Sequence, residues 1–170
     1  SYQDLSAFRT AVNSGNTFSG QIVYLLNDIE IPDGVDWTPI GTEDYPFMGT
    51  FMGGTGYAGS DPDTIVVHKI TNLSINGDAH GNDMLGLFGV ISGATICDVQ
   101  VSGVITGADN INTGLLAGQA RASGSATSSI ENCGTIKGSS VEGSYCVGGL
   151  IGYAQAAMSN CANHADVYGR

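Results

Sequence analysis

The chain has 170 residues, of which 42% are hydrophobic and only 12% charged, so we expect one folded domain with a substantial core. Its 16 Asp and Glu residues outnumber its 5 Lys and Arg residues, which gives a formal net charge of −11 at pH 7 and excludes the basic surface that nucleic acids and anionic membranes require. No apolar run approaches the ~20 residues of a membrane span, so we expect no membrane insertion.

A short amphipathic helix is the first element that the sequence predicts, over residues 1–15. Ser1 and Asp4 are its candidate N-caps, and Gly15 is a suitable end. We expect this helix to cover the open end of the β structure that follows, because unpaired strand edges otherwise recruit other chains. Three apolar side chains lie on one helical face: Leu5, Phe8 and Val12.

Short strands are predicted along the rest of the chain, over residues 20–170. The segments QIVYLL at 21–26, TIVVHKI at 64–70 and TICDVQV at 95–101 are rich in β-branched residues and bounded by Gly, Asn, Asp or Ser. Long segments of helical periodicity, which a helical solenoid would need, do not follow Tyr24.

Two phrases recur along this strand region in a fixed order. The first has apolar first and fourth positions and Asn or Asp at the third, and its copies stand at 26–29, 70–73, 96–99, 130–133 and 158–161. The second is rich in Gly and Leu and precedes the last three copies, at 84–89, 113–118 and 147–152. Repeats at intervals of roughly 20–50 residues are typical of stacked architectures. With strands as the local structure, they predict a parallel β-solenoid whose turns stack ~4.8 Å apart.

The third position of the first phrase is predicted to form a structural ladder. Its two flanking apolar residues can both point inward only if the chain bends between them, and Asn and Asp tolerate the left-handed conformation of a tight bend. Side chains stacked from turn to turn can then pass hydrogen bonds along the column. The ladder residues are Asp28, Asn72, Asp98, Asn132 and Asn160.

The chain resembles the GLUG-motif repeat domains of bacterial surface and secreted proteins. GLFG at 86–89 and GLIG at 149–152 are similar to the motif, and WTPIG at 37–41 followed by FMGTF at 47–51 resembles the segment that precedes such repeats. The chain departs from the pattern at an insertion near 52–63, where the family's Asp-Gly-Asn-Gly is missing. It also departs at the middle Gly-Leu copy, where Leu115 replaces the first Gly.

This resemblance implies an all-β, right-handed parallel β-helix, here with a short N-terminal capping helix. It also implies an extracellular or cell-surface location, because adhesins and immunoglobulin-A-directed metallopeptidases carry such repeats as accessory modules. We therefore expect a single domain over 1–170 that acts as a non-enzymatic adhesive, ligand-presenting or spacer module. Its partner would be a host or cell-surface protein or a glycan, and no cofactor or catalytic residue is implied. Two alternatives stay open: a carbohydrate-active enzyme on a β-helix, and an accessory domain of a surface protease.

Candidate chemistry in the sequence is sparse. Asp61 and Asp63, beside Tyr57, form the best carboxylate pair for glycoside hydrolysis, although a solvated turn around Pro62 is the favoured interpretation. Calcium could bind acidic turns, with Asp78 and Asp83 as candidate ligands. The loop at 33–44 offers four further carboxylates, Asp33, Asp36, Glu43 and Asp44. Solvated acidic turns are again favoured.

The cysteines and the C-terminal end complete the expectations. Cys133 and Cys161 share one phrase position and should stack inside the solenoid, and we interpret the cysteines mainly as buried free thiols. The disulfide state of Cys97, Cys133, Cys146 and Cys161 stays open. The final repeat has no predicted cap, so we expect either that the natural protein continues beyond Arg170 or that the C-terminal edge self-associates.

Overall fold

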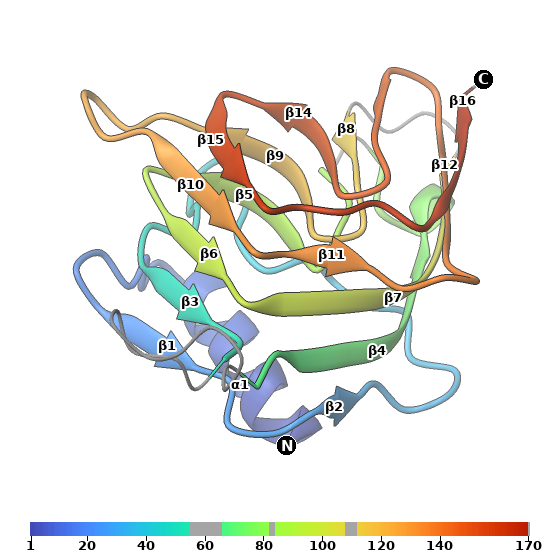
Figure 1. The fold of residues 1–170 in the computed structure, drawn as a ribbon, viewed down its shortest axis with the longest axis horizontal. Coiled ribbons are helices and arrows are strands. Elements are labelled where there is room, and N and C mark those ends of the chain that lie inside the picture. Colours follow the sequence, from blue (N-terminus) through green and yellow to red (C-terminus); the bar gives the residue numbers. More distant parts are fainter. Residues whose placement is uncertain (55–65, 82–83, 108–111, 170) are drawn as a thin grey trace.

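A computed structural model describes residues 1–54, 66–81, 84–107 and 112–169. The chain folds into a right-handed parallel β-solenoid of about four turns. In the view of Figure 1 the helix α1 lies at the lower end of the solenoid and the last strands lie at the upper end. All named strand pairs are parallel. The predicted fold is confirmed. No helix among the described residues is long and apolar enough to cross a membrane.

The helix α1 spans Tyr2–Asn13, and Ser1 is its N-cap. The Ser1 hydroxyl accepts a hydrogen bond from the Asp4 amide, and the Asp4 carboxylate accepts one from the Ser1 amine, so the two residues form a capping box. The helix ends before the expected Gly15, with Ser14 as its C-cap. Leu5 and Val12 are buried, as the predicted apolar face requires.

Three long sheets form the faces of the solenoid. Sheet A contains, in spatial order, β1 (Ile22–Tyr24), β3 (Thr50–Met52), β6 (Thr95–Cys97), β10 (Ser128–Glu131) and β15 (Ala156–Ser159). Sheet B contains β2 (Ile29–Glu30), β4 (His68–Asn76), β7 (Val99–Thr106), β12 (Ser140–Gly143) and β16 (Asp166–Gly169), with β11 (Gly134–Thr135) also paired to β7.

Sheet C and a smaller sheet close the back of each turn. Sheet C contains β5 (Phe88–Ser92), β9 (Ala117–Arg121) and β14 (Ile151–Ala154). The two-stranded sheet pairs β8 (Asn112–Thr113) with β13 (Cys146–Val147). A single 3-10 turn follows β4 at Gly77–Ala79.

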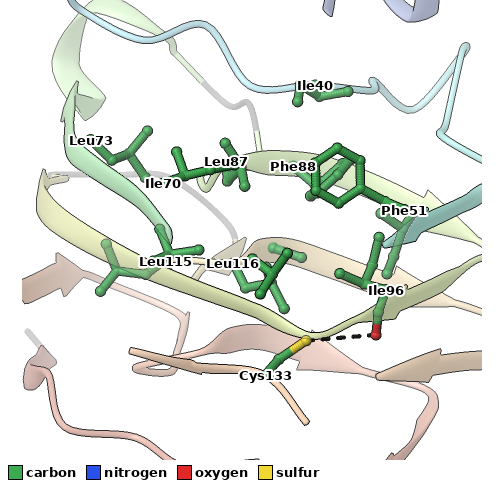
Figure 2. Close-up of a cluster of buried hydrophobic side chains, with 14 of the residues drawn as sticks. Ile40, Phe51, Ile70, Leu73, Leu87, Phe88, Ile96, Leu115, Leu116 and Cys133 are labelled. Carbon is green, nitrogen blue, oxygen red and sulfur yellow. Dashed lines mark hydrogen bonds between the residues drawn. The ribbon is translucent and has the colours of Figure 1, made fainter. Parts of the chain in front are cut away.

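The core consists of columns of apolar side chains, one residue from each turn. In sheet A the pairing register stacks Val23, Phe51, Ile96, Ile130 and Met158 on one another. Figure 2 shows Phe51 and Ile96 packed against Phe88 from sheet C, and Leu115 and Leu116 belong to the same buried cluster. Because each residue meets its equivalent in the next turn, a short repeated pattern is sufficient to fill a continuous core.

The helix is anchored to the first turn by aromatic and cationic contacts. The Phe8 ring packs edge-on against Phe18 and Phe47, with ring centroids 5.0 and 5.5 Å away. The Arg9 guanidinium lies over the Trp37 ring, 4.7 Å from its centroid. Trp37 is fully buried, and its indole N–H donates to the Leu87 carbonyl at 3.1 Å. Trp37 of the WTPIG segment therefore contacts both α1 and the segment that leads into β5.

Most of the insertion that the sequence predicts near 52–63 lies outside the described residues, which resume at 66. On either side of the gap, Gly54 forms an isolated bridge with Val67.

Candidate functional site

The corner between sheets A and B is built by polar residues in a left-handed conformation. Asp98, Asn132 and Asn160 follow β6, β10 and β15, and their φ angles are 56°, 53° and 51°. The Asn132 side-chain amide donates to the Asp98 carboxylate at 2.6 Å. The structure therefore brings these three ladder candidates to one corner, and a side-chain hydrogen bond joins two of them.

Gly53 occupies the same corner one turn below Asp98, a position that the repeated phrase did not indicate. Its amide donates to the Cys97 carbonyl at 2.8 Å. A Cβ atom on Gly53 would come within 2.3 Å of the Asp98 carbonyl oxygen and 2.2 Å of a Val99 methyl group. Only glycine fits this close approach.

The other two ladder candidates lie at sheet B, Asn72 within β4 and Asp28 just before β2. Asn72, with a φ of 61°, stands where the pairing of β4 with β7 shifts register. Its side-chain amide donates to the Ile31 carbonyl at 2.8 Å and to the Asp33 carboxylate at 2.9 Å. Asn72 therefore ties the loop after β2 to the second turn instead of joining the Asp98 column.

Asp28 stands just before β2 and binds the next turn. Its carboxylate accepts a hydrogen bond from the Lys69 amide at 3.0 Å and lies 3.1 Å from Nδ1 of His68. The Lys69 backbone hydrogen bond, followed by the His68 contact, lowers the pKa of Asp28. The ionised carboxylate thus links the first two turns through its contacts with Lys69 and His68.

The cysteines after the corner are thiols that bond to the turn below. Cys133 donates to the Ile96 carbonyl at 3.6 Å, the dashed contact in Figure 2, and Cys161 donates to the Ile130 carbonyl at 3.5 Å. Burial raises the pKa of Cys133 to about 12 and that of Cys97 to about 11. All four cysteines are free. Burial therefore disfavours the thiolate form, which a nucleophile or metal ligand needs, at Cys97 and Cys133.

The acidic residues considered as calcium ligands do not gather at one place, and some of them pair with other residues of the chain. Asp36 accepts a hydrogen bond from the Asn76 amide at 2.8 Å and lies 3.4 Å from Nε2 of His80, while Glu43 pairs with Arg121. Asp78 lies in the 3-10 turn, and Asp83 is outside the described residues. Within the part of the chain that is described, no three His, Cys, Asp or Glu side chains gather as a metal site requires.

The carboxylate pair considered for glycoside hydrolysis, Asp61 and Asp63 beside Tyr57, also lies outside the described residues.

Two grooves meet on the outer face of sheet B, and we call them together the sheet B groove. One has a volume of about 470 Å³ and the other about 390 Å³. They share Ile136 and Lys137, so the surface runs from Glu30 in the first turn to Asn160 in the last. Its polar lining residues include Thr71, Gln100, Ser102, Asn132, Asn160 and His164. Sequence reasoning missed this groove because its residues come from separate turns.

The glycines of the second repeated phrase also stack, at the start of sheet C. Gly118 and Gly152 occupy equivalent positions between residues paired in β9 and β14. A Cβ atom on Gly118 would come within 2.7 Å of the Leu85 nitrogen, and one on Gly152 within 2.4 Å of the Thr113 nitrogen. These two glycines of the motif therefore mark positions where the backbones of neighbouring turns approach too closely for a side chain.

Comparison with known proteins gives one family-model match, in the C-terminal part of the chain. No curated protein and no solved structure matches it. Residues 143–168, which run from the end of β12 into β16, match the family model described as the GLUG motif, so the chain is a parallel β-solenoid that carries this motif.

Proposed function

We propose that the chain is a non-enzymatic, ligand-presenting module of an exported bacterial surface protein, with adhesion through the sheet B groove. The observation that carries this proposal is the continuity of the groove across several stacked turns. Side chains from different turns are held in a fixed register by the paired strands, so the surface is organised before a ligand arrives. The GLUG motif supports the assignment to a surface protein.

A neutral glycan is the ligand class that suits this groove best. Amide and hydroxyl groups of Gln100, Asn132, Asn160 and Ser102 offer both donors and acceptors to sugar hydroxyls. An acidic polymer would have to approach a chain whose formal net charge is −11, with Lys137 as the permanent cation in the groove.

The test is binding of the immobilised chain to soluble polysaccharides, with dextran and laminarin as neutral probes and hyaluronate as an acidic one. Ser102→Arg places a long side chain in the groove, and Thr95→Arg is the matched control on the outer face of sheet A in the same turn. We expect a neutral probe to bind, with at least a tenfold loss of affinity in Ser102→Arg and parent-like affinity in Thr95→Arg. If no neutral probe binds, or if both variants bind equally well, the groove is not a glycan site.

A further inference from the structure

The sheet B groove is longer along the solenoid axis than across it. Its lining residues come from successive levels of the solenoid, namely β2, β4, β7, β11 and the segment 160–164. Neighbouring levels of parallel strands lie ~4.8 Å apart, so the steps from Glu30 to Asn160 cover about 19 Å. Along β7 the groove runs from Gln100 to Val104, which is about 13 Å at ~3.3 Å per residue. A long ligand therefore fits best with its length parallel to the axis.

The strand register places equivalent groove residues above one another. Glu30 pairs with Thr71 of the next turn. Gln100 pairs with Gly134, which in turn forms a parallel bridge with Ala162. A chain laid along these columns therefore meets an equivalent position of the surface at each turn.

Polar groups that can bind a ligand recur at the same interval. Thr71 and Ser102 offer hydroxyl groups in the second and third turns, and Asn132 and Asn160 offer amides in the turns that follow. Within the described part of the chain, the side chains of Thr71, Ser102 and Asn160 form no hydrogen bond, so their donors and acceptors are available. Ile136, which lines both cavities, adds an apolar contact for the C–H face of a sugar ring.

We propose that the sheet B groove takes a linear, extended glycan that lies parallel to the solenoid axis, with about one sugar unit per turn. This assignment rests on the proposed function and specifies the shape of the ligand. A β-1,4-linked glucose chain advances by nearly the height of one turn with each sugar, whereas a β-1,3-linked chain coils. The cavities of about 470 and 390 Å³ each match the size of a small-molecule site, so together they admit several sugar units.

The first experiment measures affinity against ligand length by isothermal titration calorimetry of the 170-residue chain. Cello-oligosaccharides of two to six units are the extended probes, and laminari-oligosaccharides of the same lengths carry the same glucose units in a coiled chain. We expect each added β-1,4-linked unit to strengthen binding about two- to tenfold, the factor of one net hydrogen bond, up to four or five units. The β-1,3-linked hexasaccharide should bind at least about tenfold more weakly than cellohexaose.

Arginine substitutions at the two ends of the groove test the direction in which the ligand lies. Thr71→Arg obstructs the lower part and Ala162→Arg the upper part, while Thr95→Arg adds the same charge on the outer face of sheet A. Each end variant should bind cellohexaose about tenfold more weakly and cellobiose within about twofold of the parent, because a short ligand still finds free turns. Thr95→Arg should match the parent at every length, and circular dichroism checks that all three variants are folded.

The outcomes separate the shape of the ligand from the existence of the site. If neither series of oligosaccharides binds, the proposed function fails and the axial arrangement fails with it. If affinity stops rising at the disaccharide, or if both linkages bind equally well, the groove binds a glycan but not along the axis. Parent-like binding of cellohexaose by both end variants overturns the axial arrangement in the same way.

Discussion

Single residues with left-handed backbone conformations fix where the chain turns from sheet A to sheet B. Asp98, Asn132 and Asn160 have positive φ angles, a conformation that costs most L-residues roughly 1–2 kcal/mol. Asn and Asp reduce this cost because their short polar side chains form local hydrogen bonds. At Asn132 the partner is Asp98 in the turn below, so one residue both shapes its own corner and ties it to the next.

Two substitutions at Asn132 separate these contributions. Asn132→Ala should destabilise the chain by about 1–2 kcal/mol, because it loses the bond to Asp98 and keeps the left-handed backbone. Asn132→Gly loses the same bond but accepts a positive φ without strain, so it should cost less. Urea unfolding followed by circular dichroism gives both values. If the two variants are equally stable, backbone strain at this corner does not contribute.

At the scale of elements, local pattern is sufficient to predict the helix and many of the strands, whereas the register of the second turn cannot be predicted. The copies of the first phrase at 70–73 and 96–99 look alike, which suggests that Ile70 stacks on Ile96. Instead, Ile70 pairs with Val101, and the partner of Ile96 in the turn below is Phe51. The insertion near 52–63 changes the interval between copies of the phrase. Similarity between two copies therefore no longer indicates which residues of neighbouring turns are paired. The sheet B groove could not be predicted either, because Gln100 and Lys137 meet only after the turns stack.

The helix α1 covers the lower end of the apolar core, and we expect this to be its main contribution to stability. Leu5→Ala should cost about 2–5 kcal/mol, since Leu5 is 4% exposed and its removal leaves a cavity at the lower end of the core. Gln3→Ala, on the exposed face of the same helix, should change stability by less than about 0.5 kcal/mol. Urea midpoints of the two variants give the comparison. Equal midpoints would mean that α1 does not seal the solenoid.

At the scale of the whole molecule, charge opposes the compact state that the stacked core favours. Each turn buries apolar columns, while the chain carries 16 acidic residues against 5 basic ones. Exposed like charges repel one another over a distance of about 10 Å at 0.1 M salt. Paired exceptions exist, such as Glu43 with Arg121, which joins the loop before β3 to β9.

Neighbouring charge reversals at residues 43 and 44 distinguish the effect of net charge from the effect of this pair. Both Asp44→Lys and Glu43→Lys make the net charge less negative by two units, and both residues are exposed. Asp44→Lys should raise stability by up to about 0.5 kcal/mol at low salt, with a gain that shrinks as NaCl is added. Glu43→Lys should lose about 0.2–1 kcal/mol relative to Asp44→Lys, because it also sets a cation against Arg121. Thermal midpoints of the parent and both variants, measured from low to high NaCl, provide the comparison. A parent midpoint that does not rise with salt, together with no gain in Asp44→Lys, would show that the excess negative charge does not limit the stability of this solenoid.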